Sequence, residues 1–182
     1  MTTPFAASSG NQNPSGIGFW SLVAEDRRTQ EHGMGSQGFW ALYAHRFGNW
    51  RMGLPKLLRI PATLSYRVMA KFVQLLCGID LPFTVQVGRR VRLEHFGGMI
   101  LIAHSIGDDV TIRQNKTFGI KKIMGERAWP RIGNGVDIGV GAVIIGDVSV
   151  GEGAMIGANA VVLEDVPPGA VAVGVPARVI ER

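Results

Sequence analysis

Apolar residues recur at every sixth position through the C-terminal part of the chain. The run comprises Ile132, Ile138, Ile144, Val150, Ile156 and Val162, and a small or apolar residue follows each of them four positions later: Val136, Ala142, Val148, Ala154, Ala160 and Val166. This period matches neither an amphipathic helix nor a half-buried strand. It is typical of a parallel β-helix built from hexapeptide turns, in which the sixth residue points inward. The residue four positions later must be small because the interior narrows at the corner.

The same period extends upstream, with two interruptions. The period continues at Ile100, Ile106, Ile112 and Phe118. A one-residue slip precedes Ile100, and before the slip the same period connects Val87, Leu93 and Met99. The slip falls near residues 95–99, and an extra stretch at about 120–131 separates two further coils. A regular coil needs neither feature, so we expect functional sites at these two places.

The N-terminal part follows a different pattern, with apolar residues at helical spacing. We predict three helices within residues 17–79: one ending at a glycine, one capped by Ser36, and one over about 55–77 in which Pro61 marks a break or kink. Residues 1–16 are predicted to form a disordered tail, and 80–182 the β-helix. The helices could cap one end of the β-helix or pack between subunits, and a membrane-surface role for the third helix is a further alternative.

Composition narrows the class of protein. A single cysteine, Cys77, fits a reducing compartment, and the first 16 residues lack the features of a signal peptide, so a cytoplasmic location is expected. There is no uninterrupted apolar run of a length that spans a membrane. The net charge of +5 suits a phosphorylated small molecule, and no pattern of a nucleic-acid-binding module is present.

Several motifs carry a resemblance to a known family. They are "GID" before "VGRRVRLEH", "IGDDVTIRQNKTFG", "IGNGVDIGVGAVIIGDVSVGEGAMIGANAVVLEDVPPG" and "VAVGVPARVI". With them the sequence resembles the left-handed β-helix, hexapeptide-repeat acyltransferases, in particular the serine O-acetyltransferase branch and related polysaccharide-modifying O-acetyltransferases. The resemblance implies the left hand of the helix, a homotrimer or a dimer of trimers, and acetyl-CoA bound in the groove between subunits.

The resemblance also implies a catalytic pair. Acetyl transfer to a hydroxyl needs a base, and imidazole is the usual base at neutral pH. His95 lies at the slip, and Asp80 precedes it by 15 residues, close to one coil, as the catalytic aspartate and histidine of serine acetyltransferases do. Asp80 would then orient the imidazole. The alternatives are a hydrogen-bonded corner histidine and a capping aspartate.

The substrate residues are predicted in the same way. Glu94 stands where the family has an acidic residue facing the amino group of the substrate, although an exposed carboxylate is an equal alternative. Arg127 resembles the family's carboxylate-binding arginine, but Ala128 and Trp129 follow it where serine acetyltransferases have a histidine. Because an aromatic ring suits a sugar, this departure leaves a sugar acceptor open.

For the cofactor, the resemblance indicates Gly119 beside the thioester. Arg178 is a candidate partner for a CoA phosphate, and an exposed terminal arginine is an equal alternative. Ala142 and Ala160, one coil apart, would leave room for the pantetheine arm, although the repeat itself also demands small residues there. Lys116 occupies an apolar position of the repeat and is predicted to point toward the groove or a neighbour. A zinc site is not predicted, since the chain has only His32, His45, His95 and His104 and none further on. His104 is predicted to pack at a corner.

The sequence therefore predicts an acetyl-CoA-dependent O-acetyltransferase with a small-molecule hydroxyl acceptor. L-serine, for cysteine synthesis, is the first acceptor, and a sugar hydroxyl in exopolysaccharide or lipopolysaccharide assembly is the alternative. A non-catalytic hexapeptide scaffold is the competing class.

Overall fold

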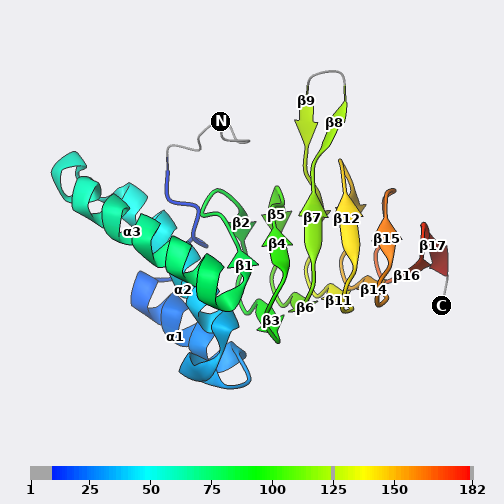
Figure 1. Cartoon of the computed structure of the whole chain (residues 1–182), viewed down its shortest axis with the longest axis horizontal. Helices are drawn as coiled ribbons and strands as arrows, with labels where there is room; N and C mark the ends of the chain where they lie inside the picture. The colour runs from blue at the N-terminus through cyan, green and yellow to red at the C-terminus, as the bar shows by residue number, and fades with distance from the viewer. Residues whose placement is uncertain (1–9, 124–125, 181–182) are drawn as a thin grey trace.

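The computed structural model describes residues 10–123 and 126–180. Three α-helices, α1 (Phe19–Thr29), α2 (Gln37–Trp50) and α3 (Lys56–Cys77), precede the strands, and two short 3-10 helices, η1 (Gly33–Gly35) and η2 (Arg51–Gly53), connect them. The helices lie at one end of an elongated body of stacked coils, and the C-terminus lies at the other end (Figure 1).

The strands form three parallel sheets, one for each side of a prism. The first sheet has the order β1 (Ile79–Asp80), β4 (Met99–Leu101), β7 (Thr117–Gly119), β12 (Val143–Ile145) and β15 (Val161–Val162). The second contains β13 (Ser149–Val150), β10 (Arg131–Ile132), β5 (Ser105–Ile106) and β2 (Gln86–Val87). The third contains β17 (Ala177–Ile180), β16 (Val171–Gly174), β14 (Met155–Ile156), β11 (Asp137–Ile138), β6 (Thr111–Arg113) and β3 (Arg92–Glu94), with β17 antiparallel to β16. This arrangement confirms the predicted fold, an N-terminal helical segment followed by a left-handed parallel β-helix.

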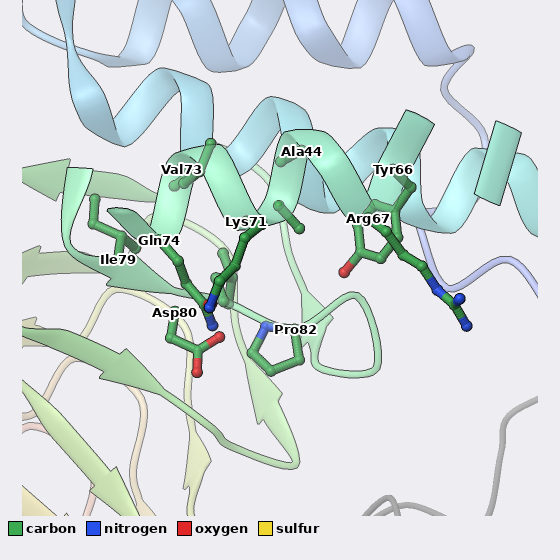
Figure 2. A pocket seen from close by; sticks show the side chains of 12 residues that line it. Ala44, Tyr66, Arg67, Lys71, Val73, Gln74, Ile79, Asp80 and Pro82 are labelled. Carbon is green, nitrogen blue, oxygen red and sulfur yellow. The ribbon is translucent and has the colours of Figure 1, made fainter. Parts of the chain in front are cut away.

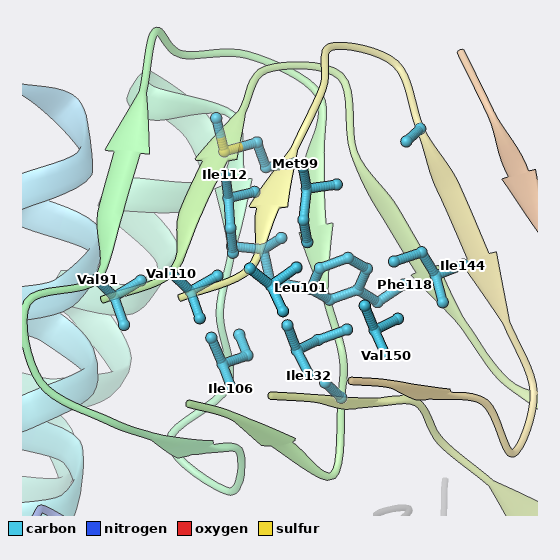
Figure 3. Packing of buried hydrophobic residues seen from close by; sticks show 14 of the residues in the cluster. Val91, Met99, Leu101, Ile106, Val110, Ile112, Phe118, Ile132, Ile144 and Val150 are labelled. Atoms are coloured by element: carbon cyan, nitrogen blue, oxygen red, sulfur yellow. The ribbon is translucent and has the colours of Figure 1, made fainter. Parts of the chain in front are cut away.

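The predicted inward residues form the core of the prism. Ile112, Ile138 and Ile156 align in successive strands of the third sheet, and all are at most 2% exposed. Phe118 and Ile144 align in the first sheet in the same way (Figure 3). Each coil thus buries its apolar side chains on those of the next coil, which is the main stabilisation of a solenoid.

The predicted register is wrong at one coil. Ile100 is 43% exposed, and the buried residue aligned with Phe118 is Leu101. His104, predicted at an inward corner, is exposed, and Ala103 is buried instead. The reason is that the turn between Leu93 and Leu101 is longer than six residues, and the next turn, to Ile106, is shorter.

Buried polar contacts join the helices to the first coil. The guanidinium of Arg46 on α2 is fully buried, pairs with Asp26 of α1 at 2.9 Å, and donates to the carbonyls of Val87 and Gly88. His45 Nε2 lies 2.8 Å from the carbonyl oxygen of Val85, and burial lowers the pKa of its imidazole to about 3. His45 is therefore neutral and structural.

The cap of α2 agrees with the prediction, whereas the first helix does not reach the glycine predicted to end it: α1 ends at Thr29, with Gln30 as its C-cap. The Ser36 hydroxyl accepts a hydrogen bond from the amide of Gly38, as an N-cap does. Pro61 lies inside α3 and does not end it. Of the predicted tail, residues 1–9 lie outside the described part of the chain, whereas Gln12 and Asn13 hydrogen-bond to Asn49 and Arg46 of α2. None of the helices in the described residues is both long and apolar enough to cross a bilayer.

The hairpin formed by β8 (Lys121–Ile123) and β9 (Glu126–Ala128) projects from the coil between β7 and β10 (Figure 1). It corresponds to the extra stretch expected at about 120–131. Among the described residues, this hairpin and the turn after Leu93 are the two places where the sequence indicated a departure from regular coils.

Candidate active site

His95 lies in the long turn between β3 and β4. Its side chain is exposed, and its backbone has a φ of 61°, a left-handed conformation that is uncommon outside glycine. Gly97 and Gly98 follow with φ values of 100° and 62°. Arg90, Asp109, Asn115 and Asn159 have similar φ values of 54–58°, so this conformation recurs in the turns of the coils.

The end of α3 and the next coil hold this turn in place. The amide of Gly97 donates to the carbonyl of Cys77, and the amide of Met99 donates to that of Gly78, at 3.2 and 2.9 Å. On the other side, the amide of Asn115 donates to the carbonyl of Gly97 at 3.1 Å. A Cβ atom on Gly78 would lie 3.1 Å from Cα of Gly97, so a glycine is needed for this close approach.

Asp80 lies two residues after Gly78, at the end of β1, and its backbone pairs with that of Ile100 in β4. Its carboxylate lines a cleft of about 240 Å³ between α3 and the first coil, where Lys71 and Gln74 extend from α3 toward it (Figure 2). It also lines a second cleft of about 330 Å³ together with Gly98. Sequence analysis missed these α3 residues, although the short connection from Cys77 to Asp80 signals that the end of the helix must lie beside the aspartate.

Asp80 and the His95 turn therefore lie on adjoining coils beside the end of α3. Within the described part of the chain, no hydrogen bond or ion pair joins the two side chains, and His95 does not line either Asp80 cleft. The catalytic pairing thus stays a prediction.

Glu94 is held by arginines. Its carboxylate lies 3.2 Å from Nε of Arg113 and 3.6 Å from Nη1 of Arg92. Arg113 also hydrogen-bonds to Asp137 on the next coil, which raises the pKa of its guanidinium. Sequence spacing contains the signal for this ladder, because β3, β6 and β11 are consecutive strands of one sheet.

The four cofactor candidates lie on three coils and at the C-terminal end. Gly119 ends β7 beside the hairpin, and its carbonyl accepts from the amide of Gly146 at 3.1 Å. Ala142 and Ala160 are stacked on consecutive coils as predicted, with side chains wholly buried in the prism. Arg178 is exposed on β17 and has no acidic partner within the described residues, so its guanidinium is available to an anion.

Arg127 lies in β9, where its backbone pairs with Lys122. Its side chain lies outside the described part of the structure, so its predicted contact with a substrate carboxylate stays a prediction. Trp129 follows at the base of the hairpin and is half-buried.

The structure contradicts the prediction that Lys116 points toward the groove or a neighbour. Its side chain is fully buried at the inward corner that Ala142 occupies one coil later, and it does not point toward an outer groove. Its ammonium has no hydrogen-bond partner among the residues that the structure describes. Burial, together with the charge of Arg113, lowers the pKa of Lys116 to about 8. Among the described residues, no group of three or more His, Cys, Asp or Glu side chains is placed to hold a metal ion.

Comparison with known proteins gives this site a context. No protein-family model matches the chain. It is 39% identical over 144 residues to a serine acetyltransferase of Mycobacterium tuberculosis, an alignment that covers 79% of this chain and 60% of that protein. It is 34% identical over 139 residues to the putative colanic acid biosynthesis acetyltransferase WcaB of Escherichia coli, with 75% of this chain and 83% of that protein covered. The chain belongs to the hexapeptide-repeat acyltransferases.

Solved structures agree with this membership. The hexapeptide-repeat acyltransferase described here superposes on soybean serine acetyltransferase complexed with serine with a TM-score of 0.73 and 29% identity, over 89% of this chain and 69% of that one. It superposes on serine acetyltransferase from Brucella abortus in complex with coenzyme A with a TM-score of 0.74 and 26% identity, over 88% and 67% of the two chains. The chain spans between half and three fifths of the first serine acetyltransferases it matches in sequence.

Proposed function

We propose that this protein is an acetyl-CoA-dependent O-acetyltransferase and that L-serine is its acceptor. The observation that carries the proposal is the 39% identity to a serine acetyltransferase across 79% of the chain. The long turn with His95, beside Asp80, supports it, because the departure from regular coils coincides with the candidate base.

In this mechanism, His95 accepts the proton of the acceptor hydroxyl. The freed oxygen attacks the thioester carbonyl, the carbon–sulfur bond breaks, and His95 returns the proton to the CoA sulfur, which leaves as a thiol. A positioned base of this kind contributes about 10²–10⁴-fold in rate. Asp80 orients the imidazole and stabilises its protonated form. Transfer is direct, without an acyl-enzyme.

The substrates would be held by the remaining candidates. Gly119, Ala142, Ala160 and Arg178 form the acetyl-CoA side, and the exposed Arg178 suits a phosphate. Glu94 and Arg127 form the acceptor side, with Glu94 facing the amino group of serine and Arg127 its carboxylate. Because the CoA groove lies between subunits in the family, a homotrimer or a dimer of trimers in the cytoplasm completes the proposal.

A sugar hydroxyl is the second candidate acceptor. Two observations favour it: the alignment covers 83% of WcaB, and Ala128 and Trp129 follow Arg127 in place of a histidine. Trp129 would then stack on a sugar ring.

Release of CoA thiol from acetyl-CoA separates the candidates. Turnover with serine at millimolar concentration would support serine as the acceptor. Turnover with saccharides or nucleotide sugars alone would show that a sugar hydroxyl is the acceptor instead. His95→Ala should abolish most of the activity, and His104→Ala, which removes an exposed histidine outside the site, should leave it intact. A chain that turns over none of these acceptors, or a His95→Ala variant with full activity, would contradict the mechanism.

A further inference from the structure

The outer face of α3 is a continuous apolar surface that no described element covers. Large apolar side chains that are each 58–84% exposed follow one another at helical spacing: Leu57, Leu58, Ile60, Leu64, Val68, Phe72, Leu75 and Leu76. The opposite face packs on the molecule through residues such as Val73 and Cys77, which are buried. The exposed apolar stripe therefore runs along the whole helix, about 30 Å at 1.5 Å per residue.

Such a stripe is unusual for a surface that meets only water. Single exposed apolar residues are common, but contiguous patches of this size mark interaction sites. The exposed apolar side chains of α3 contribute no burial free energy to folding, so a binding partner is the simplest explanation for the stripe.

The charge along α3 is of one sign. Lys56, Arg59, Arg67 and Lys71 lie within Lys56–Cys77, and this range contains no aspartate or glutamate. Three of these cations, Lys56, Arg59 and Arg67, line a groove of about 610 Å³ whose other lining residues, Ile60, Thr63 and Leu64, also belong to α3. The lining thus combines cationic and apolar side chains on one helix, which suits anionic headgroups above acyl chains.

We propose that α3 is a docking surface for an anionic lipid bilayer. The helix lies in the plane of the membrane interface, with Leu64, Val68 and Phe72 toward the acyl chains and Lys56 and Arg67 at the phosphates. This is the arrangement of an interfacial amphipathic helix, whose binding sums apolar burial and attraction to anionic lipid.

Charge argues against a symmetric contact in which the α3 helices of two copies pack on one another. Two α3 helices packed on one another would bring eight cations together without a carboxylate from either helix. Like charges in such a contact repel, whereas an anionic bilayer neutralises them. The end of α3 also borders the Asp80 cleft through Lys71 and Gln74, so the docked protein would hold this cleft near the bilayer.

Vesicle co-sedimentation of the full chain tests the proposal. Vesicles of equal parts phosphatidylcholine and phosphatidylglycerol should bind the protein, vesicles of phosphatidylcholine alone should bind it much less, and added salt should weaken binding. The double variant Lys56→Gln, Arg67→Gln should lose about thirtyfold in affinity, since each cation near an anionic surface contributes about fivefold. Arg28→Gln, which removes an exposed cation from α1, is the matched control.

The apolar arm uses Leu64→Gln with Phe72→Gln. Both side chains are more than 60% exposed, so folding should be preserved, and vesicle affinity should fall at least about tenfold. Leu163→Gln, an exposed leucine on the prism, should have no effect. Absence of binding to the anionic vesicles, or equal binding to both vesicle types, would overturn the proposal.

Sedimentation velocity of the same variant identifies the other occupant. If Leu64→Gln with Phe72→Gln reduces the size of the assembly in solution, a second copy covers α3 and the membrane proposal is wrong. An unchanged assembly together with lost vesicle binding supports it. Acetyl transfer to a soluble acceptor should not change in this variant, so failure of membrane docking is distinguishable from failure of the proposed enzyme activity.

Discussion

Replacing Lys116 with methionine should stabilise the protein. The lysine is fully buried at a corner of the prism, and within the described part of the chain its ammonium has no hydrogen-bond partner. Methionine has a similar length and shape without the charge, so it can fill the same space. The variant therefore removes the cost of burying a charge while keeping the packing.

The pKa gives the size of the effect. The lowering of the Lys116 pKa from 10.5 to about 8 corresponds to a free-energy cost of about 3 kcal/mol for keeping the charged lysine in the folded state. Solvent screening of the charges around Arg113 and Asp137 reduces this, so we expect Lys116→Met to raise the free energy of unfolding by about 1–3 kcal/mol at pH 7.

The sign of the pH dependence follows from linkage. Between the folded pKa of about 8 and the unfolded value of 10.5, the unfolded state binds more protons, so this group makes the stability of the wild type rise with pH. Below pH 8 the lysine is charged in both states and the penalty is complete. The advantage of Lys116→Met should therefore be full at pH 7 and should shrink as the pH approaches 10.5.

Urea unfolding followed by tryptophan fluorescence measures this difference at each pH, at a fixed protein concentration because assembly shifts stability. Lys71→Met, which replaces an exposed lysine, should leave stability nearly unchanged. A Lys116→Met variant that is less stable than the wild type at pH 7, or an advantage that is constant from pH 7 to pH 10, would refute the reasoning.

Three further predictions concern the site and the helical segment. His95→Ala should lower kcat/KM for acetyl transfer by about 10²–10⁴-fold in steady-state thiol-release assays, with far-UV circular dichroism unchanged because the side chain is exposed. Asp26→Asn should cost about 3–5 kcal/mol in urea unfolding, since it leaves Arg46 buried without its counter-ion; Asp109→Asn, at an exposed pair, should leave the unfolding midpoint almost in place. Ser36→Ala should cost about 1 kcal/mol, seen as a lower Tm, because the amide of Gly38 loses its cap, and an unchanged Tm would show that water replaces it.

The hexapeptide period predicted the β-helix because each inward residue needs an equivalent on the next coil. Period alone could not place the extra residues of the His95 turn, since Ile100 and Leu101 are both apolar and only the stacking on Phe118 distinguishes them. Gly97 and Gly98 absorb the added length through left-handed backbone conformations, which the pattern of apolar positions does not encode.

Other features depended on contacts between distant segments. Arg46 reads as a surface charge in its helix, yet it is buried because Asp26 and two carbonyls of the first coil surround it. The prediction for Lys116 was wrong because an inward corner normally holds a small or apolar residue. It therefore assumed that a charged side chain at this position would point outward, whereas the side chain is buried. The pair Asp80 and His95 was identified by resemblance, and within the described residues the structure places both on adjoining coils, so that their pairing stays a prediction.

The hydrogen bonds from Gly97 to Cys77, the last residue of α3, and from Met99 to Gly78, the residue that caps this helix, have a further consequence. These bonds connect the end of the helix directly to the His95 turn. A shift of the helix end must therefore change the free energy of the turn. If the partner bound by α3 changes the affinity of the turn for its ligand by some factor, thermodynamic reciprocity requires that this ligand changes the affinity of α3 for its partner by the same factor. Measuring either affinity in the presence of the other ligand would report the strength of that coupling.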